Sequence, residues 1–377
     1  MGVAKFVREH REWSVQSEEW TWTDDAPAWL RHWEGDGIIV RIENRKLAAL
    51  VLDLGVKTVD VRGSVKGLRV PLIDTDDEKV ACLAAEHLMS LGFRHYAFCG
   101  FVGANYSDTR CYWFQHHLAQ HGFSCMVFNP QTSLSNVDTL EYEKRSLDFR
   151  EEIAHWVASI PKPIGVMACN DICGQKLLDT CRRNGVLVPE ELAVIGVDND
   201  EVLCELSDPP LTSVVPDAVR IGYSAATLLE QLMGGRSPPA EPILVPPTGI
   251  VARRSTEVLA LEDRHLAAGL RFLRENAFHT FRVDDAARVA GMSRRVFERR
   301  FAAQIGHPPK AEVTRLRLER AKQLLAETDW NLAEIAQRTG LNYAEYLHKV
   351  FTSKTGITPG QFRHNQKNKG TLPGVSV

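Results

Sequence analysis

The feature that most constrains the fold of this chain is a pattern of landmarks that occurs twice in its last third. Each copy has an alanine, a glycine, a phenylalanine, a second glycine and a proline in the same order, at Ala287, Gly291, Phe301, Gly306 and Pro309 and again at Ala336, Gly340, Phe351, Gly356 and Pro359. The intervals agree at every step but one, where the second copy has one residue more between its first glycine and its phenylalanine. Generic helices do not share such landmarks, so the pattern indicates a duplicated unit.

Each copy is predicted to fold as a helix, a turn and a second helix. The segments VDDAARVA and NLAEIAQRT place apolar residues at helical spacing, and the glycine that follows permits a positive φ in the turn. Ser293 and Asn342 are then expected to cap the second helices at their N-termini. Phe297 and Phe301 lie four residues apart and therefore face one core, which leaves the opposite side of that helix exposed.

A second helix exposed in this way can enter the major groove of DNA and read base edges. The side chains predicted to face DNA are Ser293, Arg294, Arg295, Glu298 and Arg299 in the first copy, and Asn342, Ala344, Glu345, Tyr346 and Lys349 in the second. Arginine's planar guanidinium suits guanine O6 and N7, while lysine neutralises phosphate. Because Ala344 and Glu345 are poor donors to bases, we expect the first copy to contribute more of the sequence specificity.

The charge distribution agrees with a polyanionic partner for this third of the chain. Residues 264–377 hold 20 Lys and Arg against 10 Asp and Glu, whereas residues 1–263 hold 25 against 38. Charge alone is equally consistent with a solvated basic surface, and the duplicated pattern favours double-stranded DNA as the partner.

A family resemblance supports the same interpretation. The segments SRRVFERRF and AEIAQRTGLNYAEYLHKVFTSKTGITPGQFR resemble the AraC/XylS-type DNA-binding domain. The resemblance implies an all-α domain with two helix-turn-helix units at residues 264–365, and we expect a flexible tail at 366–377. Between the copies, KAEVTRLRLERAKQLLAET predicts a long amphipathic helix that holds the two units at a fixed spacing.

The first 258 residues alternate strand-like and helix-like segments. The predicted strands are 37–42, 58–61, 70–73, 95–101, 125–128, 164–169 and 193–197. Such alternation predicts an α/β doubly wound sensor of two lobes, built on parallel sheets with right-handed crossovers. Ligands of such sheets bind beyond the carboxyl ends of the strands.

Polar residues follow several of these strand ends. The candidate ligand residues are Asp76, Arg110, Asn170, Asp171 and Asp198. Carboxylates, an amide and a guanidinium can together satisfy the adjacent hydroxyls of a sugar, which both donate and accept hydrogen bonds. Any single Asp or Asn at a strand end can equally cap a helix or form a turn. Four separate strands supply the set, and this favours a ligand site.

The sensor also carries a family resemblance, in DEKVACLAAEHLMSLGFRHYAFCG, PEELAVIGVDNDEVLCELSDPPLTSVVPD and VPPTGIVARRST. These segments are similar to the periplasmic-binding-protein-like sensor of LacI/GalR-type regulators, and the resemblance implies that Arg110, Asn170, Asp171 and Asp198 contact sugar. A sensor joined to a DNA-binding domain implies a cytoplasmic, sugar-responsive transcription regulator. We expect a homodimer that contacts RNA polymerase, an activating role, and a pentose effector, D-xylose.

The N-terminal end departs from the family pattern. The segment VAKFVREHREWS has the apolar spacing of the helix that follows the family's first strand, and no strand-like sequence precedes it. We therefore expect the natural folded unit to extend upstream of Met1, and we expect a gap in the sheet of the first lobe. Neighbouring strands would then be left with unpaired backbone groups.

Two other classes of protein compete with a regulator. A solute-binding protein for sugar transport shares the sensor fold but has no use for two DNA-binding units. An enzyme could use Asp76 with Asp198 as an acid–base pair, or Cys169 near His95 as a nucleophilic site, but no GxxxxGK[ST], HExxH or GxSxG motif occurs. The eight cysteines lack the spacing of a zinc site, so we expect no metal, no cofactor and no catalytic residues.

Overall fold

The computed structural model describes the chain except residues 11–12, 18–27, 129–149, 258–262 and 371–377. It divides into two compact units, Met1–Ala260 and Leu261–Val377, which are described separately. Within the described ranges, no helix is long and apolar enough to cross a membrane.

The first unit contains a six-stranded sheet in the order β10-β8-β7-β6-β4-β5. The strands are β4 (Tyr96–Cys99), β5 (Cys125–Val127), β6 (Ile164–Ala168), β7 (Leu192–Val197), β8 (Thr212–Val215) and β10 (Gly249–Val251). All neighbours are parallel except β10, which pairs antiparallel with β8. Every residue of β6 and β7 is buried, as continuous apolar strands covered on both faces require.

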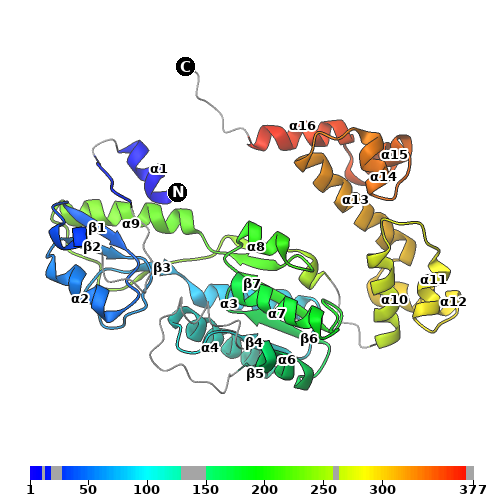
Figure 1. Cartoon of the computed structure of the whole chain (residues 1–377), viewed down its shortest axis with the longest axis horizontal. Coiled ribbons are helices and arrows are strands. Elements are labelled where there is room, and N and C mark those ends of the chain that lie inside the picture. The colour runs from blue at the N-terminus through cyan, green and yellow to red at the C-terminus, as the bar shows by residue number, and fades with distance from the viewer. Residues whose placement is uncertain (11–12, 18–27, 129–149, 258–262, 371–377) are drawn as a thin grey trace. The chain divides into compact units, whose positions relative to one another are not determined.

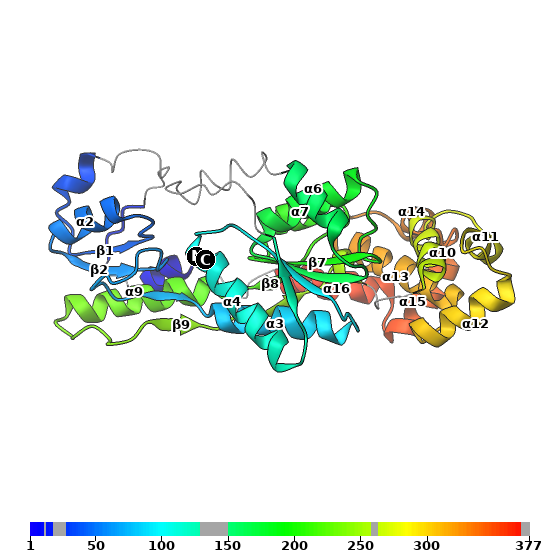
Figure 2. The same cartoon turned by 90° about the horizontal axis from the view of Figure 1, so that it is seen from below.

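Helices cover both faces of this sheet (Figures 1 and 2). They are α3 (Asp77–Ser90), α4 (Asn105–Gln120), α6 (Arg150–Ser159), α7 (Asp171–Arg183) and the short α8 (Glu201–Leu206). Asp76, Asn170 and Asp200 begin α3, α7 and α8, each accepting a hydrogen bond from the backbone N–H three residues on. The predicted alternation of strands and helices is thus confirmed, and the polar strand ends become helix starts.

The remaining strands of the first unit form two small parallel pairs. β1 (Gly37–Val40) pairs with β2 (Lys57–Asp60), and β3 (Ile73–Thr75) pairs with β9 (Ile243–Val245). The helices around them are α1 (Gly2–Glu9), α2 (Arg45–Asp53), α9 (Ala218–Met233) and the 3₁₀ helix Ala28–His32. The strand expected at 70–73 forms at 73–75, because Leu72 makes only one isolated bridge, to Asp60. The sequence interpretation also missed β8, β9 and β10, whose three or four residues give little periodicity.

β1 and β2 are neighbours in this part of the sensor, so the expected gap does not fall between them. β1 and β2 pair directly in parallel register, with Gly37 opposite Lys57. Ile38 and Val40 pack towards α2, whereas Ile39 packs with residues of α9. Both faces of β1 are therefore covered by apolar side chains.

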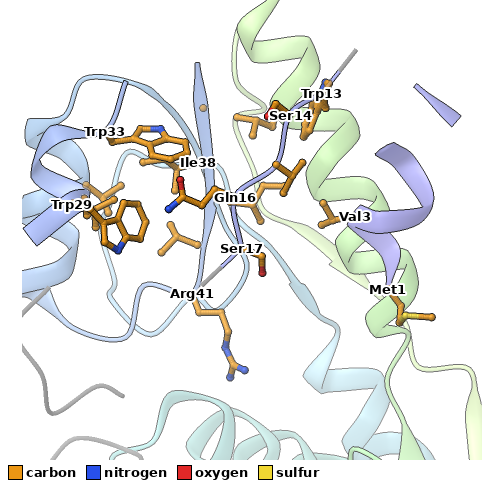
Figure 3. A pocket seen from close by; sticks show the side chains of 17 residues that line it. Met1, Val3, Trp13, Ser14, Gln16, Ser17, Trp29, Trp33, Ile38 and Arg41 are labelled. Atoms are coloured by element: carbon orange, nitrogen blue, oxygen red, sulfur yellow. The ribbon is translucent and has the colours of Figure 1, made fainter. Parts of the chain in front are cut away.

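Open space lies beside β1, in the lobe where the sequence predicts a gap in the sheet. A cavity of about 700 Å³ is lined by all four residues of β1, by Trp13–Ser17, and by side chains of α1, α2, α9 and the 3₁₀ helix. Figure 3 shows Trp29, Trp33 and Ile38 on one side of it and Val3 and Met1 on the other. In the described part of the chain, β1 pairs with β2 alone, so its second edge faces this cavity.

The second unit consists of seven helices among its described residues. They are α10 (Arg264–Glu275), α11 (Val283–Val289), α12 (Arg294–Ile305), α13 (Pro309–Glu327), α14 (Leu332–Arg338), α15 (Ala344–Thr355) and α16 (Pro359–Gly370). Pairs α11–α12 and α14–α15 are the two predicted helix-turn-helix units, and α13 is the long helix between them. α16 continues to Gly370, beyond the end expected at 365, because no proline or glycine interrupts residues 361–369.

The inserted residue of the second copy has a structural explanation. Both turn glycines have positive φ, 61° at Gly291 and 70° at Gly340. Ser293 occupies the N-cap position of α12, but its side chain makes no capping hydrogen bond. The prediction that Asn342 caps α15 is wrong, since Tyr343 holds that position and Asn342 has φ of 62°. The extra residue is thus absorbed by a second left-handed residue in the turn, which asparagine tolerates.

Candidate sugar site and DNA-binding surface

The predicted ligand residue Arg110 lies at the centre of a charged cluster in the first unit. Its side chain is almost completely buried on α4. Nε donates to Oδ1 of Asp77 at 2.7 Å, and Nη1 donates to the carbonyl oxygen of Cys169 at 2.6 Å. Its guanidinium also lies 5.2 Å from the ring centre of Tyr106. Arg110 is therefore held between α3, the end of β6 and its own helix.

Two further carboxylates are close enough to the same arginine to be affected by its charge. Burial raises the pKa of Asp74 to about 7, although the hydrogen bond from Thr75 N–H and the charges of Arg62 and Arg110 lower it. Burial likewise raises the pKa of Asp198 to about 6 against the charge of Arg110, with Asp171 adding to the rise. The cluster thus holds carboxyl groups that titrate near neutral pH.

A second arginine, which the sequence interpretation missed, completes the cluster. Arg62 follows β2 and forms an ion pair with the buried Glu43, with Nε and Oε1 3.1 Å apart. Its guanidinium lies 4.7 Å from the ring centre of Tyr106, so this ring has beside it one arginine from the segment after β2 and one from α4. Asn105 donates from Nδ2 to the carbonyl oxygen of Gly63 at 3.1 Å, a second contact between α4 and the loop after β2.

The five predicted ligand residues have different structural roles. Asp76 caps α3 and pairs with Lys79, with Nζ and Oδ2 3.0 Å apart. Asp171 is buried and accepts hydrogen bonds from Ser213 Oγ at 2.6 Å and from the N–H of Asp200 at 2.8 Å. Its carboxylate is thus used internally, and burial raises its pKa.

Asn170 and Asp198 are placed differently from these two. Asn170 accepts from the N–H of Cys173 through Oδ1 and donates through Nδ2 to the hydroxyl of Tyr106 at 3.3 Å. Part of Asp198 is exposed to solvent although protein surrounds its carboxyl group, and its φ of 109° is an unusual backbone conformation that turns the chain after β7. The structure thus places Arg110 and Asn170 against Tyr106, with Asp198 close enough to Arg110 to be affected by its charge, and leaves Asp76 as the N-cap of α3.

Sequence reasoning did not commit to Asp74, Asp77, Arg62 or Tyr106. Asp74 and Asp77 flank Asp76 in the segment IDTDDE, so the same strand end supplies all three carboxyl groups. Tyr106 follows Asn105 at the start of α4, where an aromatic residue four positions before Arg110 was a usable signal. Arg62 carried no signal, because its role depends on a contact made between distant segments.

The DNA-binding unit presents the predicted side chains on α12. Phe297 and Phe301 are completely buried, and Ser293, Arg294, Arg295 and Arg299 are exposed while Glu298 is half-buried. Arg294 is tied to two carboxylates, Glu298 at 2.9 Å and Asp284 at 3.1 Å. Within the described part of the chain no hydrogen bond or ion pair holds the side chains of Arg295 and Arg299. These two guanidinium groups are therefore available to a partner.

The second reading helix, α15, has a buried face like that of α12 but exposes different side chains. Leu347 and Phe351 are completely buried. Asn342, Glu345, Tyr346 and Lys349 are exposed and Ala344 is half-buried, and Tyr343 has 72% of its surface accessible. A tyrosine pair, one carboxylate and one lysine offer few bidentate donors to base edges.

α13 makes polar contacts with α10 and with the loop that follows it. Arg317 donates from Nε to the carbonyl oxygen of Ala277 at 2.6 Å and from Nη2 to that of His279 at 3.1 Å. Burial alone would raise the pKa of Glu312, but its hydrogen bond from Arg315 and the charge of Arg274 hold that pKa below its usual value. These contacts fix α13 against α10 and the loop after it.

A sensor with parallel sheets followed by two helix-turn-helix units defines the class of protein: a DNA-binding transcription regulator with a periplasmic-binding-protein-like sensor domain. Residues 85–256 match the periplasmic binding protein-like domain, and residues 286–365 match a helix-turn-helix domain. The chain is a sugar-responsive DNA-binding transcription regulator and not an enzyme, because the relatives that match it along most of its length are transcription regulators.

Three of these relatives share both parts of the chain. The xylose operon regulatory protein of Escherichia coli K12 is 29% identical over 374 residues, covering 96% of this chain and 92% of that protein. The protein of the same name from Haemophilus influenzae is 28% identical, covering 88% and 85%. The solved structure of a xylose-binding transcription activator is 28% identical and covers 97% and 93% of the two chains with a TM-score of 0.79.

Proposed function

We propose that the sensor binds a pentose, D-xylose, and that this sugar changes the affinity of the protein for its operator DNA. The observation that carries the proposal is the charged cluster around Tyr106. Arg62 and Arg110 supply donors, and Asp74 and Asp198 supply acceptors, which is the set that adjacent hydroxyls of a sugar require. The names of the relatives support xylose as the particular sugar.

Of the predicted ligand residues, we assign direct sugar contacts to Arg110, Asn170 and Asp198. Asp171 holds the turn that carries Asp198, and Asp76 holds the start of α3. Asp171 is left out because its carboxylate accepts three hydrogen bonds within the sensor. Among the described residues no hydrogen bond holds the carboxylate of Asp198, so this group can accept from a ligand.

The regulator is proposed to act as a homodimer in the cytoplasm and to activate transcription by contacting RNA polymerase. Two reading helices per chain would give a dimer four, enough for two half-sites. Sugar would favour the sensor conformation in which both lobes contact it, because a ligand stabilises the state that it binds best. Activation and the effector follow the relative described as a xylose-binding transcription activator.

A thermal-shift panel tests the effector. D-xylose, L-arabinose, D-ribose, D-glucose and D-galactose are each titrated against the full chain. A sugar present at about 100 times its dissociation constant adds roughly 2.7 kcal/mol to the stability of the sensor, so D-xylose should give the largest rise in melting temperature. A rise for D-glucose or D-galactose with none for D-xylose would assign a hexose effector. No rise with any sugar would contradict the proposed function.

A further inference from the structure

The turn that carries Asp198 is an unusual piece of backbone that needs support. Asp198 and Asn199 both have positive φ, 109° and 51°, which non-glycine residues seldom adopt in succession. Two side chains hold the backbone of this turn: Ser213 Oγ accepts from the N–H of Asn199 at 3.0 Å, and Asp171 accepts from the N–H of Asp200 at 2.8 Å. Ser213 and Asp171 are themselves hydrogen bonded to each other.

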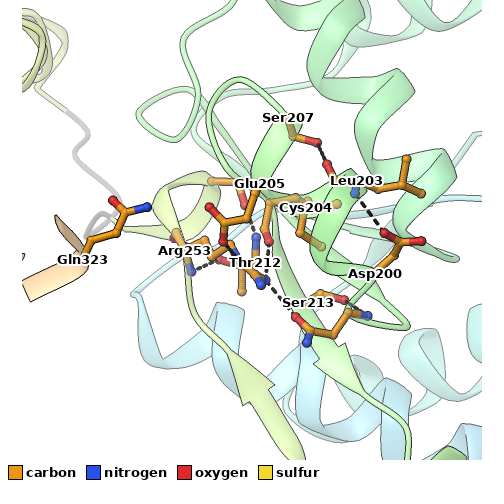
Figure 4. Close-up of polar contacts among 12 residues, drawn as sticks. Asp200, Leu203, Cys204, Glu205, Ser207, Thr212, Ser213, Arg253 and Gln323 are labelled. Carbon is orange, nitrogen blue, oxygen red and sulfur yellow. Dashed lines mark hydrogen bonds and ion pairs between the residues drawn. The ribbon is translucent and has the colours of Figure 1, made fainter. Parts of the chain in front are cut away.

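A third residue reaches this turn from the last strand of the sensor. Arg253 follows β10, and its Nη1 donates to Oδ1 of Asn199 at 2.9 Å and to the carbonyl oxygen of Leu211 at 3.0 Å. Nε donates to Glu205 of α8 at 2.7 Å. Figure 4 shows Arg253 among Glu205, Thr212 and Ser213, with dashed contacts on both sides of its guanidinium. The side chain of Arg253 is only 10% exposed, whereas that of Glu205 is 52% exposed.

The segment that begins with Arg253 is fastened tightly to the sheet. The backbone of Arg253 exchanges two hydrogen bonds with the hydroxyl of Thr212, at 2.8 and 2.9 Å. Two residues on, Ser255 is completely buried and donates from Oγ to the carbonyl oxygen of Val194 in β7 at 2.6 Å. The chain runs from this segment to the DNA-binding unit, whose first helix begins at Arg264.

We infer that Arg253 is a positioning residue that couples sugar binding to DNA binding. Asp198 is bound to the sugar in the proposed function, on which this inference rests. A sugar that moves the Asp198–Asn199 turn changes the hydrogen bond from Arg253 to Asn199, and with it the start of the segment that leads to the DNA-binding unit. The fork of the guanidinium suits this role, because it bonds the turn and α8 at the same time.

The experiment separates coupling from binding by using two substitutions and one control. Arg253→Ala removes the whole connection. Asn199→Gly removes the acceptor but keeps a residue that tolerates φ of 51°. Glu205→Gln alters only the exposed partner and retains a hydrogen-bond acceptor. For each full-length variant, the dissociation constant for D-xylose is measured by calorimetry. The affinity for operator DNA is then measured without sugar and with saturating sugar, and the melting temperature is recorded.

In the wild-type chain we expect saturating sugar to change DNA affinity by about 5–150-fold, the usual range for coupled sites. Arg253→Ala and Asn199→Gly should bind sugar and sugar-free DNA nearly as the wild type does, but sugar should then change DNA affinity by less than about twofold. Glu205→Gln should respond like the wild type. If Arg253→Ala does not fold, the response of Asn199→Gly decides the matter.

Two results would overturn the inference in distinguishable ways. A full sugar response in both Arg253→Ala and Asn199→Gly, with normal binding of sugar, would overturn the coupling role alone. If no sugar of the panel changes the DNA affinity of the wild-type chain, both the proposed function and the coupling role of Arg253 are overturned. If Arg253 only stabilised the fold, Arg253→Ala would lower the melting temperature. It would not leave sugar binding normal while reducing the effect of sugar on DNA affinity.

Discussion

Arg110 and Asp77 form a buried ion pair in the sensor, with the guanidinium Nε and carboxylate Oδ1 2.7 Å apart and both side chains at most 11% exposed. The pair joins α4 to the first turn of α3, close to the carboxylates of Asp74 and Asp198. Removing one member of such a pair leaves the other charge buried without compensation.

Arg110→Ala should therefore lower the free energy of unfolding by about 3–5 kcal/mol, measured by urea denaturation of the full chain. Lys79→Ala is the matched control, because Lys79 pairs with Asp76 but is 62% exposed, and its loss should cost less than about 1 kcal/mol. Equal effects of the two substitutions would show that the Arg110–Asp77 pair contributes no more than a surface contact.

Asp198→Asn should weaken binding of the effector sugar by about 1.5–3 kcal/mol while sugar-free DNA binding stays unchanged. Asparagine tolerates the positive φ at this position, so the change removes the charge without altering the turn. Asp200→Asn, in the same turn and also exposed, serves as the control, since its side chain caps α8. If the Asp198→Asn protein binds the sugar with the affinity of the wild-type protein, Asp198 does not contact the sugar.

Asp74→Asn should stabilise the protein at pH 8 by about 1–3 kcal/mol and have little effect at pH 4. The folded protein raises the pKa of Asp74 to about 7, so this carboxyl favours folding while it is protonated and loses that contribution as the pH rises towards 7. Urea denaturation at both pH values measures the difference. Asp53→Asn, at an exposed position on α2, should change stability equally at both values.

Arg295→Ala and Arg299→Ala should each reduce discrimination between operator and single-base variants by about 1–3 kcal/mol, measured by fluorescence anisotropy. Arg294→Ala should cost less discrimination, because Arg294 is already bonded to Glu298 and Asp284. Glu345→Ala should leave DNA affinity unchanged or increase it, since it removes a negative charge near phosphate. Normal operator binding by both arginine variants, with loss in the Glu345 variant, would reverse the roles of the two copies.

Gly340→Ala should destabilise the DNA-binding unit by more than about 1 kcal/mol. A Cβ there would lie 2.8 Å from the carbonyl oxygen of Phe278, and the φ of 70° is unfavourable for alanine. Gly356 also has positive φ, but a Cβ added there meets no neighbour. Gly356→Asn should therefore lower the stability by only a few tenths of the loss caused by Gly340→Ala. Melting curves of the two variants compare these positions directly.

The duplicated landmarks made the DNA-binding unit readable from the sequence to within one residue at the start of α15. The error arose because a one-residue insertion can be placed in the turn or in the helix, and only the backbone conformation of Asn342 distinguishes them. The sensor was less readable. Its longer strands were predicted correctly, but β9 and β10 are short and pair with segments distant in sequence.

Individual ligand residues were harder to predict for the same physical reason. A carboxylate at a strand end can cap a helix, as Asp76 does, or hold a neighbouring turn, as Asp171 does. Which role it takes depends on distances between segments that are far apart along the chain. Arg62 belongs to the cluster solely through such a distance, so neither spacing nor composition could have indicated it.

The second edge of β1 has a consequence for how the protein behaves at high concentration. Its backbone amides and carbonyls face a cavity between two apolar layers, and in the described residues β2 is its one partner strand. An edge of this kind is a template for the strand of another molecule, because pairing there satisfies the backbone and covers apolar surface together. Self-association of the chain should therefore begin beside Gly37–Val40, and it should grow with protein concentration without depending on sugar or DNA.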